Sequence, residues 1–93
     1  MVLPVALADM EQAADWYGER AASLRLSFLA DLERRIDQIL EFPEAAPIYR
    51  GTMRRILFAK FPHGIFYVIR GDIIKILAVL HLKQRPDALK RRG

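Results

Sequence analysis

The apolar residues of this chain follow a helical spacing in its first half and a strand-like pattern in its second half. From Val5 to about Glu19, apolar side chains recur every three or four residues, at Ala6, Met10, Ala13, Ala14 and Tyr17. Pro4 suits the first turn of this segment, where a missing N–H leaves no hydrogen bond unmade. A second apolar stripe runs from Ser23 to Phe42, and Pro43 marks its end. The two segments predict an antiparallel pair of helices.

The pattern changes in the stretch from Pro43 to Gly51, whose Pro and Gly residues are typical of a loop. Three runs rich in β-branched and aromatic residues follow, namely Met53–Phe61, Ile65–Arg70 and Ile73–Leu82. The segments between them, Pro62–His63–Gly64 and Arg70–Gly71–Asp72, have the composition of turns. We therefore expect a three-stranded antiparallel meander.

The last two predicted strands are nearly continuous apolar runs, which indicates that both of their faces are at least partly covered. One face has to pack against the helices, and the other is a candidate binding face. The predicted fold class is α+β, with a two-helix hairpin packed on a small antiparallel sheet of three to four strands. At 93 residues, we expect a single domain spanning residues 1–93.

Composition narrows the classes of protein and of site. With 53% hydrophobic residues and only five Gly and five Pro, the chain does not resemble a disordered regulator. It has no Cys, which excludes disulfides, thiolate catalysis and cysteine zinc sites, and its two His predict neither a metal centre nor a cofactor. The apolar residues 2–8 lack the basic flank of a signal peptide and are too short to span a bilayer. We expect a cytoplasmic protein without a membrane partner.

Charge is divided between the two halves of the chain. Residues 1–46 carry four basic and nine acidic side chains, a net charge of −5, whereas residues 47–93 carry eleven basic and two acidic ones, a net charge of +9. Such a basic half points to an acidic or polyanionic partner, although an uneven but merely solvated surface is the alternative.

A set of residues in a fixed order then resembles a known family. These residues are Ala13, Trp16 and Tyr17, the prolines Pro43 and Pro47, Arg54–Arg55, the segment Phe61–Tyr67, and Ala78–His81 followed by Pro86. In order and spacing they resemble the ParE branch of the RelE/ParE toxin superfamily, with its β-α-α-β-β-β order. The chain departs from that pattern in three places: only Met1–Leu3 precede Pro4, His63 replaces a Tyr, and Leu89 replaces a Trp.

The resemblance implies the toxin component of a type II toxin–antitoxin system, held in a hetero-oligomer with a cognate, ParD-like antitoxin. Operator DNA would be contacted only through that antitoxin. An acidic, partly disordered antitoxin segment can order itself along apolar grooves with cationic rims. The residues expected to bind it are Trp16, Leu29, Leu32 and Ile36.

Three functions remain open at this point. ParE-like toxins inhibit DNA gyrase without catalysis of their own, and this is the favoured function. RelE-like toxins cleave messenger RNA on the ribosome, which requires an acid, a base and cations. The third alternative is an inactive toxin-like binding module that represses its operon together with the antitoxin.

Each function predicts its own residues. The residues predicted to contact the target are Arg55, His63, Lys83, Arg85, Lys90, Arg91 and Arg92. The residues that a nuclease would use are His81, Tyr67, Lys83 and Arg85, with His63 and Lys60 as further candidates.

Several of these residues also have a purely structural interpretation. His81 ends an apolar run, where a histidine commonly caps a strand, and His63 is expected to be solvated in its turn. Tyr67 is expected in the core with its hydroxyl at the edge. Arg54 and Arg55 must point to opposite faces of their strand, so at most one of them belongs to a given patch. Trp16 is expected to be partly exposed.

Overall fold

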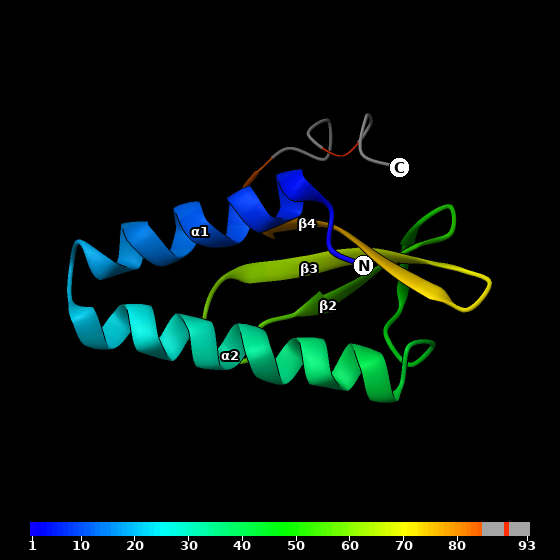
Figure 1. The fold of residues 1–93 in the computed structure, drawn as a ribbon, viewed down its shortest axis with the longest axis horizontal. Coiled ribbons are helices and arrows are strands. Elements are labelled where there is room, and N and C mark those ends of the chain that lie inside the picture. Colours follow the sequence, from blue (N-terminus) through cyan, green and yellow to red (C-terminus); the bar gives the residue numbers. More distant parts are fainter. Residues whose placement is uncertain (85–88, 90–93) are drawn as a thin grey trace.

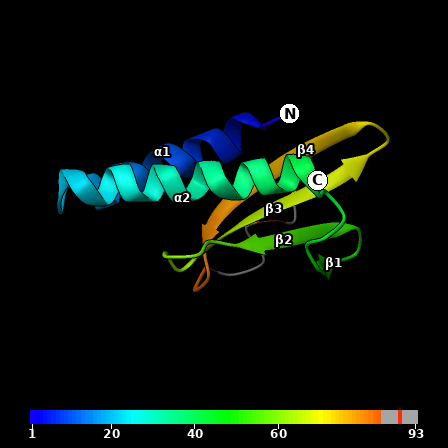
Figure 2. The same cartoon turned by 90° about the horizontal axis from the view of Figure 1, so that it is seen from below.

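The computed structural model describes residues 1–84 and residue 89. Its elements follow in the order α1 (Pro4–Gly18), α2 (Ala22–Glu41), β1 (Ile48–Arg50), β2 (Met53–Leu57), β3 (His63–Arg70) and β4 (Ile73–His81). The two helices lie antiparallel over one face of the sheet (Figures 1 and 2). The α+β class, the helix hairpin and the antiparallel sheet that the sequence predicted are confirmed.

The sheet has the strand order β1-β2-β3-β4, and neighbouring strands are antiparallel. Gly51 and Gly71, in the two tight turns, have φ angles of 57° and 60°, a left-handed conformation that favours glycine. A bulge between Phe66 and Tyr67 shifts the register of β3 against β4. The strands thus follow their chain order in the sheet, and the β3–β4 pair contains one irregularity.

The fourth strand of the sheet comes from the segment after α2, and the start of the chain adds only an isolated bridge. Val2 forms only a single parallel bridge with Ile76, supported by the bond from the Leu3 N–H to the Ile76 carbonyl (3.0 Å). The fourth strand of the sheet is Ile48–Arg50, inside the segment that the sequence predicted to be loop. That prediction was wrong because a three-residue strand between Pro and Gly carries no periodicity of its own.

The connection between β2 and β3 also differs from the prediction. The strand predicted to reach Phe61 ends at Leu57, because the N–H groups of Ala59 and Lys60 donate to the Asp31 carboxylate (3.2 and 2.8 Å) instead of to a strand. The chain turns there, and His63 and Gly64 then begin β3. The placement of His63 in a solvated turn was therefore wrong: its side chain is only 6% exposed.

Side chains from both helices and from one face of the sheet form the main core. Phe28 on α2 stacks on Phe58 and Tyr17, with ring centroids 5.1 and 5.4 Å apart. Ile65 and Tyr67 alternate onto this inner face from β3. Within the described residues, neither helix is both long and apolar enough to cross a membrane.

The outer face of the sheet has a smaller apolar cluster. Phe66, Ala78 and Leu80 are buried there together with Leu89, which is 5% exposed. Leu89 therefore lies against the sheet, and the apolar centre of the outer face is covered in the free chain.

Candidate functional site

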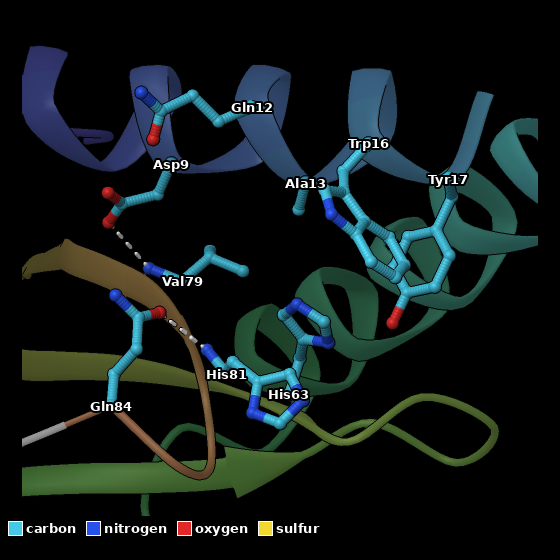
Figure 3. Close-up of a pocket in the computed structure, with 9 residues that line it drawn as sticks. All are labelled: Asp9, Gln12, Ala13, Trp16, Tyr17, His63, Val79, His81 and Gln84. Carbon is cyan, nitrogen blue, oxygen red and sulfur yellow. Dashed lines mark hydrogen bonds between the residues drawn. The ribbon is translucent and has the colours of Figure 1, made fainter. Parts of the chain in front are cut away.

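A pocket of about 310 Å³ opens between α1 and the adjoining ends of β3 and β4 (Figure 3). The helix contributes one face at helical spacing, and the strands contribute the floor. The lining residues are Asp9, Gln12, Ala13, Trp16, Tyr17, His63, Val79, His81 and Gln84. Two predicted groups meet here that the sequence had kept apart: Trp16, from the antitoxin-binding set, and the two histidines.

His63 stands in an aromatic surrounding at one end of the pocket. Its ring centroid is 5.1 Å from Phe28, 5.7 Å from Phe58 and 5.8 Å from Tyr17. Burial, together with the neighbouring His81, lowers the pKa of His63 to about 4, so the imidazole is neutral at pH 7. Its Nδ1 atom is buried and has no hydrogen-bond partner.

His81 faces His63 across the strand pair. The two residues are directly opposite in the register of β3 and β4, and their ring centroids are 5.2 Å apart. The His81 Nδ1 atom accepts a bond from the Lys83 N–H (3.0 Å), and the His81 N–H donates to Gln84 Oε1 (2.9 Å). The expectation that His81 caps the end of its strand is confirmed. An accepting Nδ1 places the ring proton on Nε2.

The opposite end of the pocket is acidic and polar. An Asp9 oxygen accepts a bond from the Val79 N–H (3.0 Å), and Gln12 and Gln84 lie beside it (Figure 3). None of the described Lys or Arg residues lines the pocket. The sequence analysis missed Asp9, Gln12 and Gln84, although the spacing of Asp9, Gln12 and Trp16 on one helix face was a signal that could have found the first two.

Trp16 forms the exposed rim of this pocket. Its side chain is 51% exposed, as predicted for partial exposure, and it packs edge-on against Tyr17 with a centroid distance of 5.0 Å. The guanidinium carbon of Arg20 lies 3.2 Å from the centre of the Trp16 ring. Burial raises the pKa of Tyr17, and the nearby Arg20 opposes this shift.

Tyr67 is separate from the pocket. Its side chain is fully buried, and its hydroxyl donates to the Pro43 carbonyl (2.7 Å), which ties the loop after α2 to the sheet. Burial raises the pKa of this hydroxyl. The expectation that Tyr67 is a core residue is confirmed.

The two neighbouring arginines of β2 point to opposite faces, as predicted. Arg54 faces the helices, where one of its nitrogens donates to the carbonyls of Glu44 (2.9 Å) and Ala46 (2.7 Å). Arg55 lies opposite Phe66 on the outer face, with its guanidinium carbon 4.8 Å from the centre of the Tyr49 ring. Arg54 is thus a structural residue, and Arg55 is the one that a partner could reach.

The other residues predicted to contact the target, to serve a nuclease or to bind the antitoxin differ in how far their side chains are exposed. Lys60 and Lys83 are exposed, whereas Arg85, Lys90, Arg91 and Arg92 lie outside the described residues. Of the residues predicted to bind the antitoxin, Leu32 is 6% exposed and Leu29 and Ile36 pack against the main core. Trp16 is therefore the one exposed member of that set, whereas Leu29 and Ile36 are half-buried and Leu32 is buried.

A second hollow, of about 290 Å³, lies between the end of α2 and β2. The exposed side chains of Phe42 and Leu57 flank it. Across residues 1–84 and 89, no three His, Asp or Glu side chains come together in a way that could hold a metal ion.

Two comparisons with known proteins gave matches that cover most of the chain. The sequence model of the family described as "ParE toxin of type II toxin-antitoxin system, parDE" matches residues 2–86. A solved structure described as the chromosomal ParDE toxin–antitoxin system from P. aeruginosa has a similar fold, with a TM-score of 0.65 and 16% sequence identity over 86% of this chain and 90% of that chain. No curated protein matches the sequence.

Proposed function

The chain belongs to the ParE toxin family and is the toxin component of a type II toxin–antitoxin system, and from that membership we propose that it inhibits DNA gyrase without catalysis of its own. Its partner in the cell is an antitoxin. The observation that carries the proposal is the chemistry of the pocket, whose described lining residues include no Lys or Arg, the cations that the alternative function, cleavage of messenger RNA, requires.

Cleavage of RNA needs cations around a phosphate whose negative charge grows in the transition state. Among the described residues that line the pocket, none is a Lys or Arg. His63 is neutral and buried, and the Nδ1 atom of His81 is occupied by the Lys83 N–H. The Tyr67 hydroxyl donates a hydrogen bond to the Pro43 carbonyl (2.7 Å), and Tyr67 does not line the pocket that holds both histidines. These observations favour a toxin that acts by binding.

The outer face of the sheet is the surface that we assign to the target. Arg55 on β2 and Lys75 on β4 lie on this face, directly opposite Phe66 and Val68 in the strand register. They border the apolar cluster around Phe66, and such an arrangement suits an acidic surface on a partner protein. Arg85, Lys90, Arg91 and Arg92, which belong to the basic half of the sequence, remain part of this proposed contact set.

The helix side is the surface that we assign to the antitoxin. Trp16 is exposed there, at the rim of the pocket between α1 and the ends of β3 and β4. Separate surfaces would let the antitoxin hold the toxin without competing for every contact that the target uses. We place this function in the cytoplasm, within a single toxin domain of residues 1–93, with operator DNA contacted only through the antitoxin.

The test is a supercoiling assay with purified gyrase, relaxed plasmid and purified toxin. We expect cleaved plasmid to accumulate, and Arg55→Gln should weaken this effect more than Arg34→Gln, an equal charge change on the exposed side of α2. Unaltered supercoiling with excess toxin would contradict the proposal. Cuts in ribosome-bound transcripts would then identify an endonuclease, and the absence of growth arrest would identify an inactive binding module.

A further inference from the structure

Building on the proposed inhibition of gyrase, we infer that Tyr49 is a positioning residue on the outer face of the sheet. Together with Gly64, it holds the guanidinium of Arg55 ready to bind a carboxylate of the target protein. The three residues come from β1, β3 and β2, so their arrangement depends on the fold of the sheet. Arg55 was predicted from the sequence to contact the target, whereas Tyr49 and Gly64 were not predicted to have any part in that contact.

Arg55 differs from its neighbour Arg54 in the partners of its guanidinium. Both side chains are half-buried. Arg54 donates to the carbonyls of Glu44 and Ala46 on the helix side. Among the described residues, no hydrogen bond or ion pair occupies the guanidinium of Arg55. A guanidinium has five N–H donors and is always charged in proteins, so those of Arg55 can pair with an acceptor on a partner.

The ring of Tyr49 fixes the place of this guanidinium. The guanidinium carbon of Arg55 is 4.8 Å from the centre of the ring, within the range of a cation–π contact. The ring in turn packs edge-on against the buried Phe66, with ring centroids 5.2 Å apart. A cation–π contact supplies no oxygen acceptor. It therefore orients the guanidinium while leaving the N–H donors for a ligand.

Gly64 provides the space for the methylene groups of Arg55. A Cβ atom at position 64 would lie 3.2 Å from Arg55 Cγ and 3.3 Å from Arg55 Cδ, closer than an ordinary van der Waals contact. Gly64 is buried in β3, next to β2 in the sheet. Even a methyl group at this position would displace the Arg55 side chain from its present course.

A second arginine adds to the positive charge beside Tyr49. The guanidinium carbon of Arg50 lies 6.0 Å from the centre of the same ring. Within the part of the chain that the structure describes, the ion pairs join residues of the two helices, and no acidic side chain pairs with Arg50 or Arg55. Two like charges close to one ring repel each other, and an anion beside them relieves this repulsion.

A protein carboxylate suits this position better than other anions. A guanidinium binds a carboxylate through two parallel N–H···O bonds, which fixes the geometry of the pair. The half-buried Met53 and Tyr49 pack against the apolar cluster of the outer face, beside these charges. An apolar centre with a charged rim is typical of an interface between proteins. The backbone of a nucleic acid would use the charges alone.

The test measures the affinity of the purified toxin for gyrase, without DNA, by titration calorimetry. Tyr49→Leu should weaken binding about two- to fivefold, the contribution of one cation–π contact, whereas Tyr49→Phe, which keeps the ring, should bind like the unaltered toxin. Arg55→Gln should weaken binding about tenfold, and combining it with Tyr49→Leu should cause no further loss. Gly64→Ala, which keeps both the charge and the ring, should weaken binding about as much as Tyr49→Leu.

Urea unfolding of each variant shows that the compared proteins are folded, and Gly64→Ala carries the test if Tyr49→Leu does not fold. An equal loss from Tyr49→Leu with and without Arg55→Gln, or the same loss from Tyr49→Phe, would overturn the inference and leave gyrase inhibition standing. Duplex DNA that binds the toxin alone, but not Arg55→Gln, would assign the site to phosphate and overturn the inference too. An unaltered toxin that does not bind gyrase would overturn the proposed function, on which the inference rests.

Discussion

Asp31 and His63 are the two buried polar or charged residues in the described part of the chain, and both adjoin the connection between β2 and β3. Asp31 accepts bonds from the N–H groups of Ala59 and Lys60, and Arg35 lies 4.0 Å away. His63, a few residues further along, keeps one ring nitrogen without a partner. One buried polar group is satisfied by its own fold, and the other is not.

This difference indicates that Asp31 contributes to the stability of the fold, whereas His63 is available for binding. A buried carboxylate that receives two backbone donors fixes the path of the chain, so its loss should be felt in the free energy of unfolding. A buried imidazole without a donor stabilises nothing through that atom, and it lines a pocket of about 310 Å³. The Asp31 carboxylate holds the connection that leads into β3, and the His63 imidazole lines the pocket.

The largest effect on stability should come from Asp31→Ala. The change removes two hydrogen bonds to a charged acceptor and leaves the N–H groups of Ala59 and Lys60 unpaired, which should lower the free energy of unfolding by about 3 kcal/mol. Urea unfolding measures this, with Glu33→Ala on the exposed side of α2 as the control. If both variants lose less than about 0.5 kcal/mol, Asp31 does not hold this connection in place.

His63 should make stability depend on pH. In the unfolded chain its pKa is close to the ordinary value of 6.5, and in the folded chain it is about 4. Above pH 6.5 both states are neutral, but as the pH falls toward 4 only the unfolded chain takes up the proton. Stability should therefore decrease by about 2 kcal/mol between pH 7 and pH 5 and level off below pH 4.

The matched variant for this prediction is His63→Phe. Phenylalanine suits the surrounding rings of Tyr17, Phe28 and Phe58 and has no proton to gain. Urea unfolding at pH 7, 6 and 5 should show a flatter pH dependence for this variant than for the unaltered chain. Parallel pH profiles of the two proteins would show that His63 is not the group responsible.

Tyr67→Phe should have the smallest effect of the three. It removes only the bond from the Tyr67 hydroxyl to the Pro43 carbonyl, so we expect a loss of about 1 kcal/mol. Growth arrest on expression should persist at the level of the unaltered toxin. Loss of growth arrest with a normal unfolding curve would instead assign chemistry to the hydroxyl.

The same comparison explains what the sequence could predict. The helices and the longer strands were predictable because their apolar spacing is local, and the opposite orientations of Arg54 and Arg55 followed from strand alternation. The interactions of Asp31 and Asp9 were not predictable, because their partners lie 28 and 70 residues away along the chain. Spacing patterns within one helix or strand cannot predict contacts between residues so far apart in the sequence.

His63 shows how one such contact changes a prediction. The tripeptide Pro62–His63–Gly64 has the composition of a turn, yet the turn forms earlier because Asp31 takes up the N–H groups of Ala59 and Lys60. This shift moves His63 into β3, directly opposite His81, and buries it. The candidate site was therefore only partly foreseen: its histidines and Trp16 were identified individually, but their meeting in one pocket was not.

The most direct test of the account is a gyrase supercoiling assay that compares the unaltered toxin with the double variant His63→Phe/His81→Gln. If the toxin acts by binding through its outer face, both proteins should cause cleaved plasmid to accumulate at similar toxin concentrations. Supercoiling that is unaffected by excess unaltered toxin would contradict the assignment of gyrase as the target. An effect that the folded double variant lacks would contradict the assignment of the target to the outer face, because it would show that the histidines of the pocket are needed.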